Sequence, residues 1–314
     1  VPEGVRILKP YQSYLQSRWK RALLWRLRIC FPKLVRKILI KDEYDIEVSF
    51  TIMNPPLKFS ERKNVKKIAW IHGSIENFKD DEVKKSYHKE HLKNVGFIVA
   101  ISNKTRQSIV DVYPEYKEKI KTIYNGYDFN EIMVKAQEEV DVKIHPDSIC
   151  TIGRIEENKG SDRVVEVIKL LHKKGAKYHL YFIGSGNMEQ ELKNKIKEYG
   201  LNNYIHFLGY QHNPYKYLKQ MKVLLSMSKQ EGFPGVYVEA LSLGIPFVST
   251  DVGGAEELSQ NGKFGQIIYN NEEAGQQIIE YIYENKVLNV QEAREFLANF
   301  TIEEQIKNIE KIFL

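Results

Sequence analysis

The 314 residues suffice for about two domains of ordinary size, each with a core of its own. A composition of 42% hydrophobic and 28% charged residues is ordinary for a soluble globular protein. The longest apolar run, residues 97–101, is far too short to cross a bilayer, which excludes a transmembrane topology. Only two cysteines, Cys30 and Cys150, are present, which excludes a disulfide scaffold or a cysteine-based metal site and is typical of a reducing compartment.

The net charge of +6 is concentrated at the start of the chain. Residues 1–41 hold 11 Lys or Arg against one acid, Glu3. Residues 42–146 hold 17 basic and 18 acidic side chains, and residues 147–314 hold 19 and 22. The positive charge therefore belongs to one segment and not to the whole molecule.

Apolar residues recur every three or four positions between residues 14 and 39, with Lys and Arg in the gaps, which predicts an amphipathic helix that Pro32 divides in two. Three interpretations stay open. The segment packs on a core with a solvated basic face, or it rests on an anionic membrane surface through residues 11–41. The third interpretation, nucleic-acid binding, has no supporting motif, so no nucleic-acid partner is expected.

After the basic segment, short β-rich runs alternate with polar or helical stretches. The predicted strands are 46–50, 67–71, 97–101 and 120–124, and the helical stretches between them are 80–93 and 104–111. Residues 125–128 form a turn after the last strand, and the polar stretch 135–146 is interpreted as a linker.

The alternation resumes beyond the linker. The predicted strands are 149–152, 178–183, 205–208, 223–227 and 247–249; the predicted helices are 162–173, 188–199, 235–243 and two more within 272–313. Strands that alternate with helices indicate an α/β fold with parallel sheets and helices on both faces. In such sheets ligands bind beyond the carboxyl ends of the strands.

The first chemical motif follows the strand at 149–152. Gly153 and Arg154 come directly after the strand, and Lys159 and Gly160 precede the next helix. A guanidinium fork, an ammonium and the spare N–H groups of a helix start together suit a diphosphate. A solvated basic loop is the alternative for this motif taken alone.

The second motif follows the strand at 223–227. Glu231 and Glu239 bracket a helix start at Pro234 and Gly235, where backbone N–H groups are available to an anion. Glu239 can accept hydrogen bonds from a vicinal diol such as ribose, and Glu231 can hold hydroxyls of a sugar. The alternative for Glu239 is an exposed helix residue, although its apolar neighbours imply burial and hence a need for a partner.

Two glycine-rich turns give weaker signals. Gly253 and Gly254 lead into a helix within residues 251–258, but any loop could contain this pair. Gly184 and Gly186 follow the strand at 178–183 and lack the third glycine of a dinucleotide fingerprint.

Taken together, in order and spacing, the motifs resemble glycosyltransferase family 4, the retaining nucleotide-sugar-dependent transferases of the GT-B fold. The residues that carry the likeness are Gly153-Arg154, Lys159-Gly160, Glu231, Glu239, Gly244-Ile245-Pro246, Gly253-Gly254-Ala255-Glu256, Trp70-Ile71-His72-Gly73, Ala100-Ile101-Ser102, Ile123 to Asp128 and Phe300-Thr301-Ile302-Glu303. The likeness covers most of residues 42–314. It is specific for the family and not for any donor or acceptor.

The resemblance implies two Rossmann-like domains that face a cleft. Residues 1–146 would form the acceptor-side domain and residues 147–298 the nucleotide-sugar-binding domain. Residues 299–314 would form a closing helix, for which a return to the first domain is one option. The family also begins with a strand and a Gly-rich loop that do not precede Val1, so the first domain is expected to lack its opening unit.

The resemblance also assigns roles. Arg154 and Lys159 should bind the diphosphate and stabilise the departing nucleotide, with Gly153 in the same loop on the donor side. Glu239 should hold the ribose, and Glu231 the transferred sugar.

Backbone amides of Gly235 and Val236 should assist the phosphates, although Pro234 replaces the glycine usual at its position and removes one N–H. His72 matches the histidine that the first domain brings near the anomeric carbon; a histidine at the end of a core strand is the alternative. No metal or other cofactor is expected, because the Arg/Lys pair would neutralise the leaving diphosphate.

The expected function is transfer of a sugar from a nucleotide diphosphate donor to a hydroxyl acceptor with retention, in bacterial surface polysaccharide or glycoconjugate synthesis. The acceptor is expected to be a carbohydrate or lipid-linked, and the enzyme to be cytoplasmic, with the inner face of the membrane as an option. The alternatives are a nucleotide-sugar 2-epimerase-like enzyme and a catalytically silent domain that binds a partner or the membrane.

Overall fold

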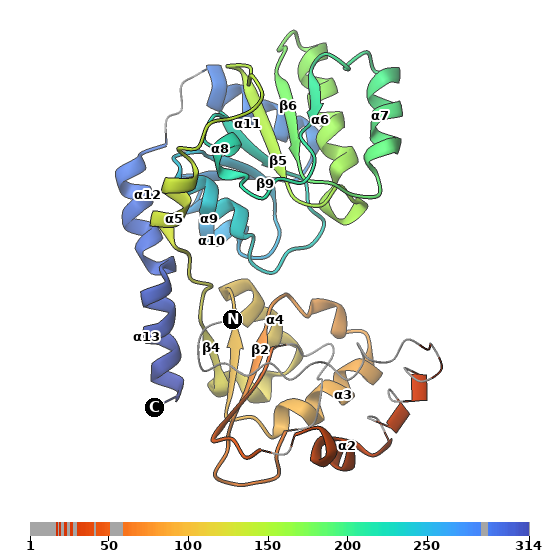
Figure 1. The fold of residues 1–314 in the computed structure, drawn as a ribbon, viewed down its shortest axis with the longest axis vertical. Helices are drawn as coiled ribbons and strands as arrows, with labels where there is room; N and C mark the ends of the chain where they lie inside the picture. The colour runs from red at the N-terminus through yellow and green to blue at the C-terminus, as the bar shows by residue number, and fades with distance from the viewer. Residues whose placement is uncertain are drawn as a thin grey trace.

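The structure is a computed structural model that describes residues 17, 19, 22–23, 26–27, 30–40, 42–50, 59–283 and 288–313. Two parallel β-sheets, each with its own helices, lie one above the other along the long axis of the molecule (Figure 1). The predicted α/β class with parallel sheets is confirmed.

The first sheet has four strands in the order β1-β2-β3-β4, all parallel. The strands are β1 (Ile46–Ser49), β2 (Lys66–Ile71), β3 (Phe97–Ala100) and β4 (Ile120–Thr122). The accompanying helices are α2 (Pro32–Leu39), α3 (Glu82–Lys93) and α4 (Asn103–Val112), with the 3-10 helices η2 (Glu76–Phe78) and η3 (Pro114–Lys119). Helix α5 (Phe129–Lys135) follows β4 in the chain but packs with helices of the second sheet (Figure 1).

The second sheet has six parallel strands in the order β10-β9-β8-β5-β6-β7. The strands are β5 (Ser148–Ile152), β6 (His179–Ile183), β7 (Ile205–Phe207), β8 (Val223–Ser226), β9 (Phe247–Thr250) and β10 (Gly265–Ile268). The helices of this part are η4 (Glu157–Lys159), α6 (Ser161–Lys173), α7 (Glu189–Glu198), α8 (Tyr215–Leu218), α9 (Gly235–Ser242), α10 (Ala255–Ser259) and α11 (Asn271–Tyr283). Because β5 pairs with both β6 and β8, the strand order reverses there, and ligands bind at such a switch point.

Successive residues of the central strands enter different cores, because side chains alternate across a strand. Ile149 of β5 and Leu225 of β8 pack with α6, α7 and α11 on one face. Cys150 and Leu224 pack with α8, α9 and α10 on the other face. The second sheet is thus covered on both faces, which is why its strands consist of almost continuous apolar residues.

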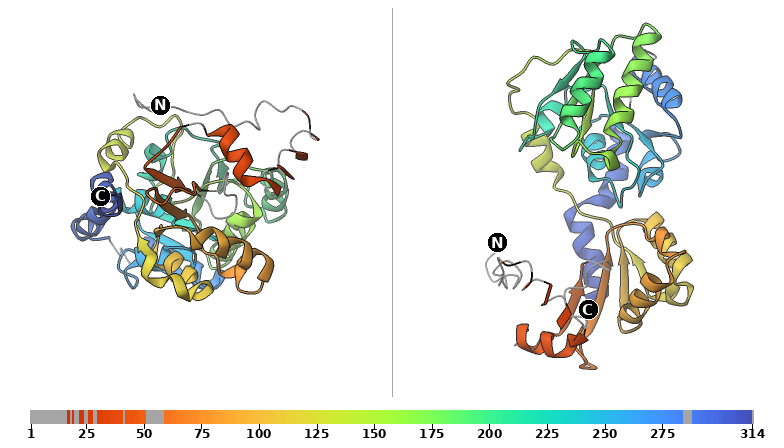
Figure 2. Two further views of the ribbon diagram at one scale, coloured as in Figure 1. Left: turned by 90° about the horizontal axis from the view of Figure 1, so that it is seen from below. Right: turned by 90° about the vertical axis from the view of Figure 1, so that its right-hand side faces the viewer.

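The chain ends with α12 (Val290–Leu297), η5 (Ala298–Phe300) and α13 (Ile302–Phe313). Helices α3 and α4 cover one face of the first sheet, and Ile312 of α13 lies in one core with Ile68 and Val99 of the opposite face. Lys66 Nζ at the start of β2 donates to the carbonyl oxygen of Phe313 at 2.6 Å. The last helix therefore leaves the second sheet and packs against the first (Figures 1 and 2).

The observed elements differ from the expected ones in four places. All nine predicted strands are present, and β10 is an additional edge strand. The stretch 272–313 forms three α-helices in place of two, and α5 and α8 were not predicted. Pro32 begins α2 as expected, but most of residues 11–29 lie outside the described part of the chain. Within the described part, none of the helices combines the length and apolar character needed to cross a bilayer.

Candidate functional site

A cavity of about 330 Å³ opens where the loops after β5 and β8 meet, at the switch point of the second sheet. Seven of the predicted site residues line this cavity: Gly153, Arg154, Lys159, Glu231, Gly235, Val236 and Glu239. His72 does not line it. The two loops that carried the strongest sequence motifs therefore form one site.

Glycine at position 160 allows the backbone after Lys159 to lie close to the end of β8, and this close contact positions Lys159. Gly160 adopts a left-handed conformation, with φ at 63°, between η4 and α6. A Cβ atom added there would lie 2.0 Å from the carbonyl oxygen of Met227, at the end of β8. Only glycine tolerates both the left-handed φ and this close contact without strain. The turn therefore directs the Lys159 side chain from the loop after β5 toward the loop after β8.

Lys159 and Glu231 form an ion pair across the cavity. Lys159 Nζ donates to Glu231 Oε1 at 2.6 Å, and the same oxygen accepts from Ser228 Oγ at 2.8 Å. The Lys159 and Glu231 side chains are 28% and 18% exposed. One carboxylate oxygen is thus held by two donors, which fixes the orientation of the carboxylate toward the cavity.

Arg154 behaves differently from Lys159. Its side chain is 73% exposed and Nη1 pairs with Glu156 Oε2 at 2.9 Å, within the same loop. The guanidinium therefore lies at the mouth of the cavity, where an anionic ligand could replace Glu156 as its partner.

Helix α9 begins at the cavity, after Pro234 at the N-cap, and no side chain caps it. The N–H groups of its first turn have no acceptor inside the helix, so those of Gly235 and Val236 are available to an anion at this end. Glycine at 235 is also needed for space, because an added Cβ atom would lie 2.8 Å from the hydroxyl of Tyr127.

Glu239 lies one turn into α9 and is half-buried. Burial raises the pKa of its carboxyl, and a hydrogen bond from the Tyr215 hydroxyl to Oε1, at 3.2 Å, opposes that rise. The hydrogen-bond partner expected for a carboxylate among apolar neighbours is therefore Tyr215, on α8. Sequence reasoning missed it, because no periodic pattern links α8 to α9.

His72 directly follows β2 in the first sheet. Its ring lies 5.8 Å from that of Phe50, and partial burial lowers its pKa. Its carbonyl oxygen lies so close to Gly232 that a Cβ atom there would be 1.9 Å away. The structure thus brings the backbone of His72 against the loop that carries Glu231, and it keeps the imidazole out of the cavity wall.

A polar clasp of four residues connects the two sheets, and sequence reasoning missed it. Glu257 of α10 accepts the N–H of Lys104 on Oε1 at 3.1 Å and the hydroxyl of Tyr124 on Oε2 at 2.7 Å. Lys104 Nζ also pairs with Asp251 Oδ1 at 2.7 Å. Lys104 lies in the first turn of α4 and Tyr124 follows β4, so a carboxylate of the second part neutralises the helix start of the first.

No metal-binding cluster is evident in the described residues: no group of three or more His, Cys, Asp or Glu side chains is placed to share one ion. The charges of the cavity itself are Arg154, Lys159, Glu231 and Glu239. Such a cavity can bind an anion through its cations and helix start, and hydroxyl groups through its carboxylates.

Known proteins resemble this chain. Residues 134–300 match the family described as Glycosyl transferases group 1. An uncharacterized glycosyltransferase of Methanocaldococcus jannaschii is 28% identical over 253 residues, which cover 74% of this chain and 62% of that protein. The poly(ribitol-phosphate) alpha-N-acetylglucosaminyltransferase of Staphylococcus aureus is 28% identical over 243 residues, 74% of this chain and 47% of that protein. The chain therefore spans about half to three-fifths of the length of these relatives.

Among solved structures, Anabaena HepE in complex with UDP superposes with a TM-score of 0.75 at 17% identity. The superposition covers 98% of this chain and 93% of that protein. The match, with two parallel sheets flanked by helices, confirms the expected GT-B fold.

Proposed function

The chain belongs to the group 1 glycosyl transferases, and from this premise we propose that it transfers a sugar from a nucleoside diphosphate donor to a hydroxyl acceptor, with retention. The observation that carries the proposal is the cavity at the switch point. It combines two cations, an uncapped helix start and two carboxylates within about 330 Å³.

The diphosphate, the ribose and the sugar of the donor would each bind to a different set of groups in the cavity. Lys159, Arg154 and the N–H groups of Gly235 and Val236 would hold the diphosphate. Glu239, kept beside Tyr215, would accept the hydroxyls of the ribose.

Glu231 would hold the transferred sugar through its hydroxyl groups. The Lys159–Glu231 pair supports this assignment of sugar and diphosphate to neighbouring groups. The Lys159 ammonium contacts the Glu231 carboxylate and also borders the part of the cavity proposed for the phosphates.

In the proposed step, the bond between the anomeric carbon and the diphosphate oxygen breaks while the acceptor oxygen bonds to the same face of that carbon. The electron pair leaves with the nucleoside diphosphate, and a phosphate oxygen takes the acceptor's proton. Lys159 and Arg154 would stabilise the negative charge that develops on the leaving group, which is the kind of electrostatic help that lowers such barriers most.

We extend the proposal to metal independence, because these cations would supply the charge neutralisation that a divalent ion supplies elsewhere. Turnover that survives excess EDTA is the expected result, and turnover restored only by added Mg²⁺ or Mn²⁺ would reject it.

We further propose a role in bacterial surface polysaccharide or glycoconjugate synthesis, in the cytoplasm. The support is the relative from Staphylococcus aureus, whose name gives poly(ribitol-phosphate) as its substrate. A carbohydrate or lipid-linked acceptor fits the same role.

A thermal-shift screen with nucleoside mono- and diphosphates tests the donor site. At 100 times the dissociation constant a ligand adds about 2.7 kcal/mol to the unfolding free energy, so one diphosphate should raise Tm clearly. The corresponding monophosphate should raise it less, and R154A should shrink the difference between the two. No shift with any nucleotide would reject the donor site.

A further inference from the structure

Ser228 lies in the loop after β8, between the strand and Glu231, and belongs to none of the sequence motifs described above. It borders the cavity at the switch point, yet the residue is only 2% exposed. Its hydroxyl donates to Glu231 Oε1 at 2.8 Å. A buried hydroxyl that contacts the proposed sugar-binding carboxylate can influence the ligand through that carboxylate.

The direction of the hydrogen bonds around Ser228 follows from counting protons. The Ser228 hydroxyl has one proton and two polar neighbours, Glu231 Oε1 at 2.8 Å and Ser226 Oγ at 3.3 Å. An ionised carboxylate only accepts hydrogen bonds, so Ser228 donates to Glu231 and accepts from Ser226. Ser226 thus occupies an acceptor position of the Ser228 oxygen and favours the orientation in which the proton of Ser228 points to the carboxylate.

Strand β9 fixes the backbone of Ser228. Thr250 Oγ1, at the end of β9, donates to the carbonyl oxygen of Ser228 at 2.6 Å. Both residues are buried, so water competes little for this hydrogen bond. The loop after β8 is therefore attached to the neighbouring strand at the residue that carries the donor, which limits how far the hydroxyl can move from Glu231.

The Ser228 hydroxyl and the Lys159 ammonium share one oxygen of Glu231. Lys159 Nζ donates to Oε1 at 2.6 Å, but an ammonium is a point charge that attracts either oxygen of a carboxylate. The second donor keeps Oε1 as the shared oxygen and leaves Oε2 for hydroxyl groups of a sugar. Without Ser228, the carboxylate could rotate and direct both oxygens to the ammonium.

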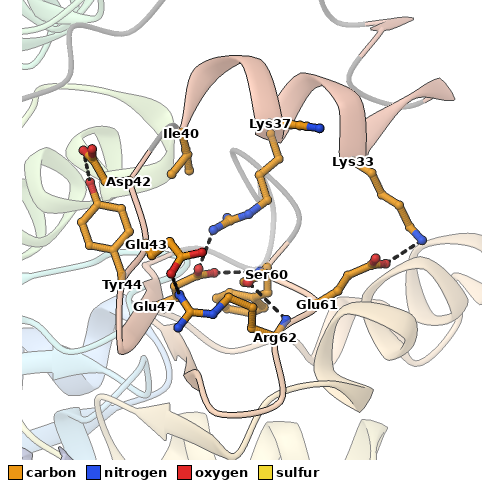
Figure 3. A pocket seen from close by; sticks show the side chains of 12 residues that line it. Lys33, Lys37, Ile40, Asp42, Glu43, Tyr44, Glu47, Ser60, Glu61 and Arg62 are labelled. Atoms are coloured by element: carbon orange, nitrogen blue, oxygen red, sulfur yellow. Dashed lines mark hydrogen bonds and ion pairs between the residues drawn. The ribbon is translucent and has the colours of Figure 1, made fainter.

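A second cavity, of about 360 Å³ beside α2, has carboxylates that are held in a different way (Figure 3). Its acids pair with cations, Glu61 with Lys33 at 2.6 Å and Glu43 with Arg62 at 3.0 Å. Such ion pairs neutralise the charge of a carboxylate. Ser228 is uncharged, so it orients Glu231 and leaves the charge of the carboxylate unchanged, which suits a group that accepts hydrogen bonds from a sugar.

We propose that Ser228 is a positioning residue that sets the affinity of the cavity for the sugar part of the donor. The inference rests on the proposed function, because it takes Glu231 as the group that binds the transferred sugar. Its own content is that the hydroxyl acts only through Glu231 and has far less influence on the nucleoside diphosphate part of the donor.

Calorimetric titration with matched ligand pairs tests the inference. The probes are UDP-glucose with UDP, GDP-mannose with GDP and ADP-glucose with ADP, and the pair that the wild type binds most tightly is used for the variants. The measured quantity is the ratio of the dissociation constant of the nucleotide sugar to that of the nucleoside diphosphate. S228A should raise this ratio about tenfold, because one hydrogen bond to a charged group is lost. S228C keeps a weak donor and should raise it about threefold.

A double-mutant cycle separates positioning from direct contact with the sugar. The carboxylate is absent from E231A, so adding S228A to that variant should change the ratio by less than about twofold. The matched control is S259A. Ser259 is also buried, and its hydroxyl donates to the carbonyl oxygen of Glu256 at 2.9 Å in α10. S259A should keep the wild-type ratio.

Each outcome separates the inference from the proposed function. An unchanged ratio in S228A and S228C would overturn the inference and leave the proposed function intact, and S228C decides the question if S228A does not fold. An equally large effect of S228A in the E231A background would also overturn the inference, because Ser228 would then contact the sugar directly. A wild type that binds none of the six ligands would reject the donor site together with the inference.

Discussion

Replacing Lys159 with Met removes the ammonium and keeps most of the side-chain length, so it isolates the charge. In the structure the ammonium contacts Glu231 Oε1 at 2.6 Å and faces the proposed diphosphate. A hydrogen bond to a charged group contributes about 1.5–3 kcal/mol. K159M should therefore raise the dissociation constant of the nucleoside diphosphate by about 10- to 150-fold. The loss of charge stabilisation in the transition state should also lower kcat by about 10²–10³.

The same change should hardly affect folding. The ion pair is partly exposed and Ser228 still donates to Glu231, so the unfolding free energy should fall by no more than about 1 kcal/mol. Lys229 offers the matched control, since its Nζ pairs with Glu157 at the same 2.6 Å without lining the cavity. Isothermal titration calorimetry and thermal unfolding of K159M and K229M measure both effects. Wild-type affinity in K159M, or an equal loss in K229M, would refute the reasoning.

Three further predictions concern other parts of the molecule. E239A should weaken nucleoside diphosphate binding and abolish the preference for ribose over 2′-deoxyribose nucleotides, whereas a preference that survives would remove Glu239 from the ribose site. E257A frees the N–H of Lys104 and should let the two sheets move apart, which small-angle scattering would detect as a larger radius of gyration. E257Q keeps an acceptor oxygen and should increase the radius of gyration less. An unchanged radius of gyration in E257A would contradict the clasp. Burial, with His145 and His206 nearby, lowers the pKa of His179 to about 4, so the unfolded chain takes up its proton first as the pH falls. The unfolding free energy should therefore decrease from about pH 6.5 toward pH 4, and less steeply in H179Q by denaturant titration; equal slopes would contradict this.

The sequence was sufficient for the sheet architecture because the strands are buried on both faces. The apolar runs that became β5, β6 and β8 are unmistakable for that reason. Strand β10, with the sequence Gly-Gln-Ile-Ile, pairs only with β9 at the sheet edge, and four residues with one polar position give no clear period. Helix α8 has four residues, too few to reveal a helical repeat.

The cavity was predictable because its residues come from two short local motifs. Gly153 to Gly160 and Glu231 to Glu239 each follow a strand, and parallel strands end at one edge of the sheet. The family resemblance that they carried is confirmed by the match over residues 134–300.

The clasp was not predictable from local sequence. Lys104 and Glu257 are 153 positions apart, and their contact depends on how the two sheets are placed. The orientation of α2 was equally hidden. Periodicity marks Leu34 and Ile38 as one side of a helix, but only the structure shows that this side faces solvent and that Val35 is the buried residue.

The most direct test of the account is to incubate the protein with a panel of nucleotide sugars and candidate acceptors. Released nucleoside diphosphate is quantified, and proton NMR gives the anomeric configuration of the product. The account predicts that one donor yields a glycosylated acceptor whose new linkage has the configuration of the donor. A free epimerised sugar, an inverted linkage or no nucleotide release from any donor would contradict it.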